Sequence, residues 1–124
     1  MRIFETAAGI TIKVGENAQE NDKLVKESHQ DYIWCHLENQ PSPHAVIETI
    51  NPDTNTINKA LQLVKYYSKA KTTNKVNLIF TKIRDLTPVK NRPGMVNMKK
   101  VPRQRSIKTD FSQLKELLGK DPSL

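Results

Sequence analysis

The residues best suited to chemistry lie close together, between Asp31 and His44. This segment holds the single Trp and the single Cys of the chain and two of its three His. Imidazole, thiol and carboxylate groups are the usual ligands of zinc, and they also act as nucleophiles, acids and bases in catalysis. The segment is therefore the first place to look for a functional site.

An alternating pattern predicts that the first half of this segment is a β-strand. Residues on one side of that strand are apolar: Ile33, Cys35 and Leu37. Trp34 and His36 lie on the other side. Residues 45–50 are apolar and β-branched enough to predict a second strand, which begins just after His44. If the two strands pair, Trp34, His36 and His44 cluster on one face of the sheet.

A zinc site in this cluster would use His36, His44 and Asp31. Neighbouring residues in a strand point to opposite faces, so Cys35 and His36 cannot bind the same metal ion. Without a metal, Asp31, Trp34, His36 and His44 either fix the sheet internally or line a small groove for a nucleotide. We favour the structural interpretation, a buried hydrogen bond between a His and Asp31. We expect no metal and no cofactor.

Catalysis has weak support in the residues. The alternation places Cys35 with the core residues, where a buried Cys behaves as a small hydrophobe. Ser42 lies near His44 in the sequence, but nothing around it resembles a nucleophile elbow. The chain has only 4 Gly and no Gly-rich phosphate loop. We therefore expect a protein that is not an enzyme.

The charge of the chain is divided unequally between its halves. Residues 1–60 carry 5 Lys/Arg and 9 Asp/Glu, whereas residues 61–124 carry 15 Lys/Arg and 4 Asp/Glu. Such an excess favours a polyanionic partner, with nucleic acid as the first candidate and a merely basic surface as the alternative. The candidate phosphate contacts are Lys65, Lys69, Lys82, Arg84, Lys90, Arg92, Lys99, Lys100, Arg103, Arg105 and Lys108. Trp34, Tyr66 and Tyr67 are candidates for stacking on a base, although we expect Trp34 to be a structural anchor.

The periodicities predict an α+β fold with a mostly antiparallel sheet of about five to six strands and about three helices. We expect a single domain over residues 1–124, with residues 119–124 as a frayed tail. A hairpin is expected over residues 3–14, and a strand over 76–81. The predicted helices span about 18–27, 56–70 and 111–118.

Prolines complicate the prediction between residues 86 and 109. Residues 86–94 contain two Pro, so we expect a loop there that cannot extend the sheet. Residues 95–101 and 106–109 are expected to be strand pieces, interrupted by Pro102 and the three residues after it. One Cys allows no internal disulfide and no apolar run spans a membrane, so we expect a cytoplasmic protein.

Four short blocks resemble the NFACT-R domain family. Residues 15–24, GENAQENDKL, resemble its G-(K/R)-N-x-x-x-N-(D/E)-x-L motif, and residues 31–36, DYIWCH, resemble D-x-x-W-x-H. Residues 42–46, SPHAV, are similar to (G/S)-x-H-(V/A)-(V/I), and residues 92–96, RPGMV, to K-P-G-x-V. The blocks occur in the family's order and cover most of the chain. The matching motif residues are Asn17, Asn21, Asp31, Trp34, His36 and His44.

The resemblance implies a small α+β domain that binds RNA. In large NFACT proteins this domain is one part of a factor that acts on the large ribosomal subunit and its tRNA in ribosome-associated quality control. We accordingly expect a small stand-alone, non-catalytic module that contacts rRNA or tRNA, and thereby the ribosome. The alternative is a docking module for a translation factor or a larger NFACT-type protein. Glu16 departs from the family pattern, which has a basic residue there.

Overall fold

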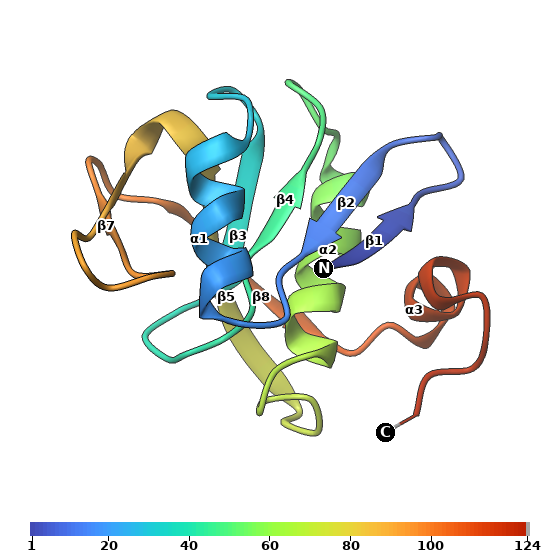
Figure 1. Ribbon diagram of the computed structural model, residues 1–124. Helices are drawn as coiled ribbons and strands as arrows, with labels where there is room; N and C mark the ends of the chain where they lie inside the picture. The colour runs from blue at the N-terminus through green and yellow to red at the C-terminus, as the bar shows by residue number, and fades with distance from the viewer. Residues whose placement is uncertain (124) are drawn as a thin grey trace.

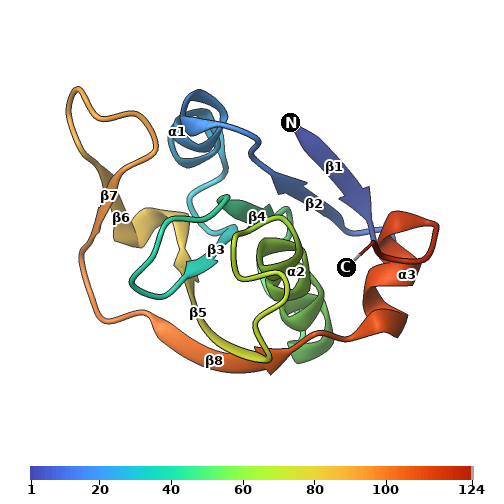
Figure 2. The ribbon, with the colours of Figure 1, turned by 90° about the horizontal axis from the view of Figure 1, so that it is seen from below.

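Six antiparallel strands form the main sheet in the order β1-β2-β4-β3-β5-β8 in the computed structural model, which describes residues 1–123. The strands are β1 (Arg2–Glu5), β2 (Thr11–Val14), β3 (Ile33–Leu37), β4 (Ala45–Ile47), β5 (Lys75–Lys82) and β8 (Arg103–Lys108). The helices are α1 (Ala18–Glu27), α2 (Thr54–Tyr66) and α3 (Phe111–Leu118), with a short 3-10 helix η1 (Ile83–Asp85). Helices α1 and α2 lie on opposite faces of the sheet (Figures 1 and 2). The predicted α+β class is confirmed.

Side-chain caps explain where the three helices begin. The Oδ1 atom of Asn17 accepts the Glu20 backbone N–H at 2.9 Å, so α1 starts at the predicted residue. Asp53 caps α2 in the same way at 2.8 Å, two residues earlier than predicted. Asp110 caps the start of α3, and Gly119, with a φ of 71°, caps its C-terminal end. No helix within residues 1–123 is long and apolar enough to cross a membrane.

The two faces of the sheet contribute to different cores. The α2 face carries the larger core, and its strand residues include Ile12, Val14, Ile33, Cys35, Leu37, Ala45, Ile47, Val76, Leu78, Phe80 and Ile107. The α1 face carries a smaller core, formed by Leu24, Val25, Trp34, Val46, Ile79, Ile83 and Leu86. The predicted alternation in β3 is therefore correct, but both of its sides are buried.

The segment between β5 and β8 differs from the prediction. Residues 86–94 do not join the main sheet, but β6 (Leu86–Pro88) pairs with β7 (Val96–Met98) in a separate hairpin. The predicted interruption holds at Pro102 but is wrong for residues 103–105, because β8 is continuous from Arg103 and pairs with β5 along its length. Pro102 precedes the first paired residue, so its missing N–H leaves no gap in the ladder.

Candidate functional site

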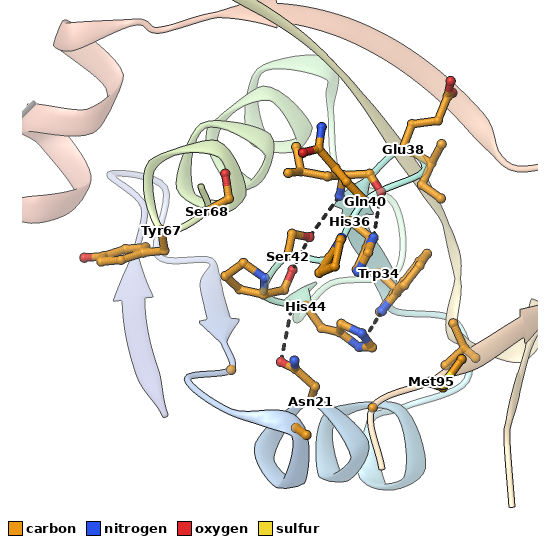
Figure 3. Close-up of a pocket in the computed structure, with 18 of the residues that line it drawn as sticks. Asn21, Trp34, His36, Glu38, Gln40, Ser42, His44, Tyr67, Ser68 and Met95 are labelled. Carbon is orange, nitrogen blue, oxygen red and sulfur yellow. Dashed lines mark hydrogen bonds between the residues drawn. The ribbon is translucent and has the colours of Figure 1, made fainter. Parts of the chain in front are cut away.

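A groove of about 1000 Å³ opens on the α1 face of the sheet. One wall is the start of α1, from Gly15 to Asn21. The loop between β3 and β4 forms a second wall, and the β6–β7 hairpin forms a third through residues 93–98. Figure 3 shows Trp34, His36 and His44 side by side between these walls. All four sequence blocks noted above thus contribute residues to the groove. The block that ends at His36 contributes through its C-terminal half.

Trp34, His36 and His44 form one aromatic cluster, as predicted. The rings of Trp34 and His36 are stacked, with centroids 5.4 Å apart and planes at 12°. The ring of His44 meets both of them edge-on, at 5.3 Å from Trp34 and 5.1 Å from His36. Antiparallel pairing of β3 with β4 brings the three side chains to the same face. Edge-on and stacked pairs of this kind hold each ring in one orientation.

His44 is a neutral, buried acceptor. The indole N–H of Trp34 donates to His44 Nδ1 at 3.0 Å, so the single proton of the neutral imidazole is on Nε2. Burial, with His36 as a smaller contribution, lowers the pKa of His44 to about 3, against the opposing effects of Asp22 and the Gly94 backbone. A group with such a pKa does not exchange protons near pH 7. His44 therefore serves to fix Trp34.

Asp31 is not the partner of either His, so the predicted His–Asp pair is wrong. Its carboxylate accepts from Arg84, with distances of 2.8 Å to Nε and 2.6 Å to Nη2. That hydrogen bond lowers the pKa of Asp31 below its ordinary value. Lys82 lies 4.0 Å from the same oxygen. Asp31 and Lys82 lie at the end of β3 and β5 that is opposite the groove, because Ile33 pairs with Lys82 there.

Asn21 joins α1 to the start of β4. Its Oδ1 accepts the backbone N–H of His44 at 3.1 Å (Figure 3). A Cβ at Gly15 would lie 2.1 Å from this oxygen, so only glycine leaves room for the contact. On the opposite wall Gly94 has a φ of +85°, and a Cβ there would lie 3.2 Å from the Ala18 carbonyl. Asn17 caps α1. Four of the six motif residues therefore make hydrogen bonds that hold the walls of the groove together: Asn17, Asn21, Trp34 and His44.

His36 is the motif residue with a ring nitrogen that has no hydrogen-bond partner within residues 1–123. Its Nδ1 lies 2.6 Å from the Leu37 carbonyl, so Nδ1 must donate and the proton is on that atom. Burial lowers the pKa of His36, which leaves Nε2 as a free acceptor at neutral pH. No hydrogen bond to Nε2 exists within the described part of the chain. The side chain is half-buried and lines the groove.

The candidate nucleophiles are engaged in structure. Cys35 is fully buried, and burial raises the pKa of its thiol to about 12, so the thiol stays protonated. Ser42 Oγ accepts the Leu37 N–H at 3.0 Å and donates to the Pro43 carbonyl at 2.9 Å rather than facing His44. Among residues 1–123, no three His, Cys, Asp or Glu side chains are grouped to hold a metal ion.

Lys65 is not on the surface, which corrects its place among the phosphate contacts. It is 1% exposed, and its ammonium donates to the Lys71 carbonyl at 2.8 Å and to Thr109 Oγ1 at 2.7 Å. Burial lowers its pKa. Lys59 of α2 is also buried and pairs with Glu116 of α3 at 2.8 Å. The helix lacks a solvated outer face because α3 and the chain after α2 pack there.

The other ten predicted basic residues reach the surface. Three of them have carboxylate partners: Lys82 and Arg84 with Asp31, and Lys100 with Asp85 at 3.3 Å. Arg103 and Arg105 lie over the ring of Phe80, and Arg105 also donates to Asn58 at 2.7 Å. Within residues 1–123, five are exposed without a carboxylate partner or a ring contact: Lys69, Lys90, Arg92, Lys99 and Lys108.

The groove also uses residues that the sequence did not single out. Ile79, Met98 and Gln104 line it, together with Pro41 and Pro102 from two separate loops. Conversely, Trp34 is 1% exposed and cannot stack on a base, so the expectation that it is a structural anchor is correct. Tyr67 packs on Phe4 and under Arg2, and Lys71 lies over Tyr66. No sequence signal places Gln104 on this face, because the residues of β8 show no apolar alternation.

Comparison with known proteins supports the resemblance. A family model for the NFACT protein RNA binding domain matches residues 1–100. The chain is 37% identical over 98 residues to the Rqc2 homolog RqcH of Bacillus subtilis, covering 77% of this chain and 17% of that protein. It is 31% identical over 98 residues to the same-named protein of Streptococcus suis, with 77% and 18% covered. The chain therefore spans less than a fifth of the length of these relatives.

A solved structure has the same fold. The C-terminal part of the fibronectin/fibrinogen-binding protein from Streptococcus suis superposes with a TM-score of 0.83 at 25% sequence identity. The superposition covers 93% of this chain and 47% of that one. Because only 7% of this chain is left out, the agreement extends past residue 100.

Proposed function

Because the chain belongs to the family of NFACT protein RNA binding domains, we propose that it is a non-catalytic RNA-binding module. Its relatives carry the name of a quality-control factor, which supports a place in translation or ribosome-associated quality control in the cytoplasm, with rRNA or tRNA as the partner. This chain matches only 17% of such a relative, so the choice of rRNA or tRNA as the partner is also part of the proposal.

The observation that carries the proposal is the set of free cations around the groove. Lys69 lines the groove itself, and Lys90 and Arg92 lie in the hairpin loop that leads into its wall. Lys108 lies on the same sheet face as Gln104, because alternate residues of β8 share a face. Lys/Arg side chains without carboxylate partners are free to neutralise phosphates and release counterions. The remaining proposed contacts lie farther along the sheet edge and at its opposite end: Lys82, Arg84, Lys99, Lys100, Arg103 and Arg105.

The test is fluorescence anisotropy with labelled tRNA, rRNA fragments and duplex DNA across a salt series. We expect Arg92→Glu/Lys108→Glu to weaken RNA binding about tenfold or more at moderate salt and to flatten the log–log salt slope by roughly two contacts, about 0.7 to 0.9 each. Lys23→Glu/Lys120→Glu is the matched control, because it makes the same charge change at exposed residues outside the proposed set. Equal losses in both variants, or no binding by the folded wild type at low salt, would contradict the proposal.

Protein docking is the second candidate, and exposed apolar residues favour it. Val101 is 85% exposed and lines a second cavity of about 330 Å³ with Ile50, which is 49% exposed. Isolated exposed residues are common on monomers, so this signal is weaker than the charge. Val101→Ser should leave RNA affinity unchanged. Loss of binding to purified ribosomes in that variant, with tRNA affinity intact, would favour protein docking instead.

A further inference from the structure

His36 offers the groove one fixed hydrogen-bond acceptor. Its ring is held on three sides: stacked on Trp34, against the edge of His44, and tied through Nδ1 to the Leu37 carbonyl. The remaining polar atom, Nε2, has no partner among residues 1–123. An acceptor fixed in this way selects ligands that present an N–H or O–H donor at one position.

The walls around His36 suit a flat, apolar ring. Pro41 and Pro43 belong to one loop, and Pro93 and Met95 belong to the opposite hairpin. A lining that combines apolar side chains from two loops with a few polar groups such as His36 resembles small-molecule sites, which are mostly apolar with a few placed polar groups. Gly94, with its positive φ, lets the hairpin approach α1 and close that wall.

The basic side chains near the groove favour a ligand that joins a flat ring to a negatively charged group. Lys69 lines the groove, and Lys90 and Arg92 flank the wall residue Pro93 on its N-terminal side. Farther along the same sheet face, Lys75 pairs in register with Lys108, so their exposed side chains lie next to each other. The groove is thus bordered by cations on more than one side, and the carboxylates that line it among residues 1–123 are Glu16 and Glu38.

We propose that this groove receives an unpaired RNA base, which donates an N–H from its Watson–Crick edge to His36 Nε2. The inference rests on the proposed RNA-binding function and adds the part of RNA that the groove reads. Every base carries a donor on that edge, and pairing in a duplex occupies it. The site therefore binds single-stranded nucleotides and rejects duplexes.

The single Trp of the chain provides the measurement, since Trp34 is stacked on His36. Its fluorescence is titrated with homopentamers of A, C, G and U. The tightest of these is then compared with an analogue that lacks the donor: purine riboside for A, 2-pyrimidinone riboside for C, N1-methylinosine for G or N3-methyluridine for U. We expect the analogue to bind at least about fivefold more weakly.

His36→Phe completes a double-mutant cycle, because it keeps an aromatic ring on Trp34 and removes Nε2. In this variant the natural pentamer and the analogue should bind equally, with melting by circular dichroism as the check on folding. If the variant does not fold, the ¹⁵N shift of His36 Nε2 in the wild type answers the same question. It should move upfield when the pentamer is added, as an acceptor nitrogen gains a hydrogen bond.

Two failures are distinguishable. A wild type that binds tRNA in a salt-dependent manner, but shows no change at His36 Nε2 and no loss with the analogue, overturns the base-binding groove alone. A wild type that binds neither tRNA nor any pentamer overturns the RNA-binding function and the groove with it.

Discussion

The two faces of the main sheet are made from the same strands, but they are covered to different extents. On the α2 face, Leu37, Leu61 and Leu78 have no exposed surface, and the helix lies along the sheet. On the α1 face, helix α1 covers Trp34 and Val46, whereas Gln104, Ser106 and Lys108 of β8 stay exposed. The uncovered part of that face adjoins the groove. We infer that the α2 face stabilises the fold and that the α1 face is available for a partner.

The largest expected effect is on stability, at the covered face. Leu61→Ala removes a fully buried side chain from the α2 core and should lower the free energy of unfolding by about 2–5 kcal/mol. Gln104→Ala on the open face should change it by less than about 0.5 kcal/mol. Urea unfolding at neutral pH measures both. Comparable losses in the two variants would mean that the faces do not differ in this way.

A smaller effect is expected from pH, and it comes from the α1 face. His44 has a folded-state pKa of about 3, whereas an unfolded His titrates near 6.5. The unfolded chain therefore binds the extra proton first, so stability is full above pH 6.5 and falls as the pH drops toward 3. Between pH 7 and pH 5 the loss should be about 2 kcal/mol, and the lowered pKa of His36 acts in the same direction.

His44→Gln is the control for this pH dependence, because its amide can still accept from the Trp34 indole but does not titrate. Asp22 faces His44, but Asp and Glu carboxylates titrate mostly below pH 5 and contribute little in this window. Urea unfolding at pH 5, 6 and 7 should give a flatter profile for the variant than for the wild type. Parallel profiles would show that His44 is not the group responsible.

The sequence predicted the cluster at the groove better than it predicted the basic surface. Trp34, His36 and His44 meet because alternation and pairing are local rules of strands, and both can be read from residue order. The burial of Lys65 could not be read in this way. It depends on Thr109 and on the loop at Lys71, and Thr109 lies 44 residues away in the sequence.

The strand β8 shows a second limit of sequence reasoning. Its residues are mostly charged or polar, with Ile107 as the buried exception, so no apolar alternation marks them. Pairing with β5 at the edge of the sheet fixes them as a strand, and basic side chains on an edge also discourage pairing with other chains. An edge strand with this composition can be identified from its pairing with the neighbouring strand, but not from its own sequence.

The smallest expected effect is at Glu16, the departure from the family pattern. Glu16 lines the groove and pairs with Arg2 at 2.8 Å on the surface. Glu16→Lys should cost less than about 1 kcal/mol of stability and should strengthen RNA binding a few-fold, because the groove becomes more positive. Glu27→Lys at the other end of α1 is the matched control, and anisotropy at two salt concentrations separates them. Equal gains would show only a net-charge effect.

The claim that the α2 face stabilises the fold and the α1 face binds RNA is tested most directly by NMR. The measurement is which backbone amide signals shift when RNA is added. A ¹⁵N-labelled sample is titrated with tRNA fragments and followed by heteronuclear NMR. We predict that the largest shifts occur at the groove and the open α1 face, at His36, residues 92–98, Gln104 and Lys108, and that α2 and α3 change little. Shifts concentrated on α2 or α3, with the groove unchanged, would contradict the account.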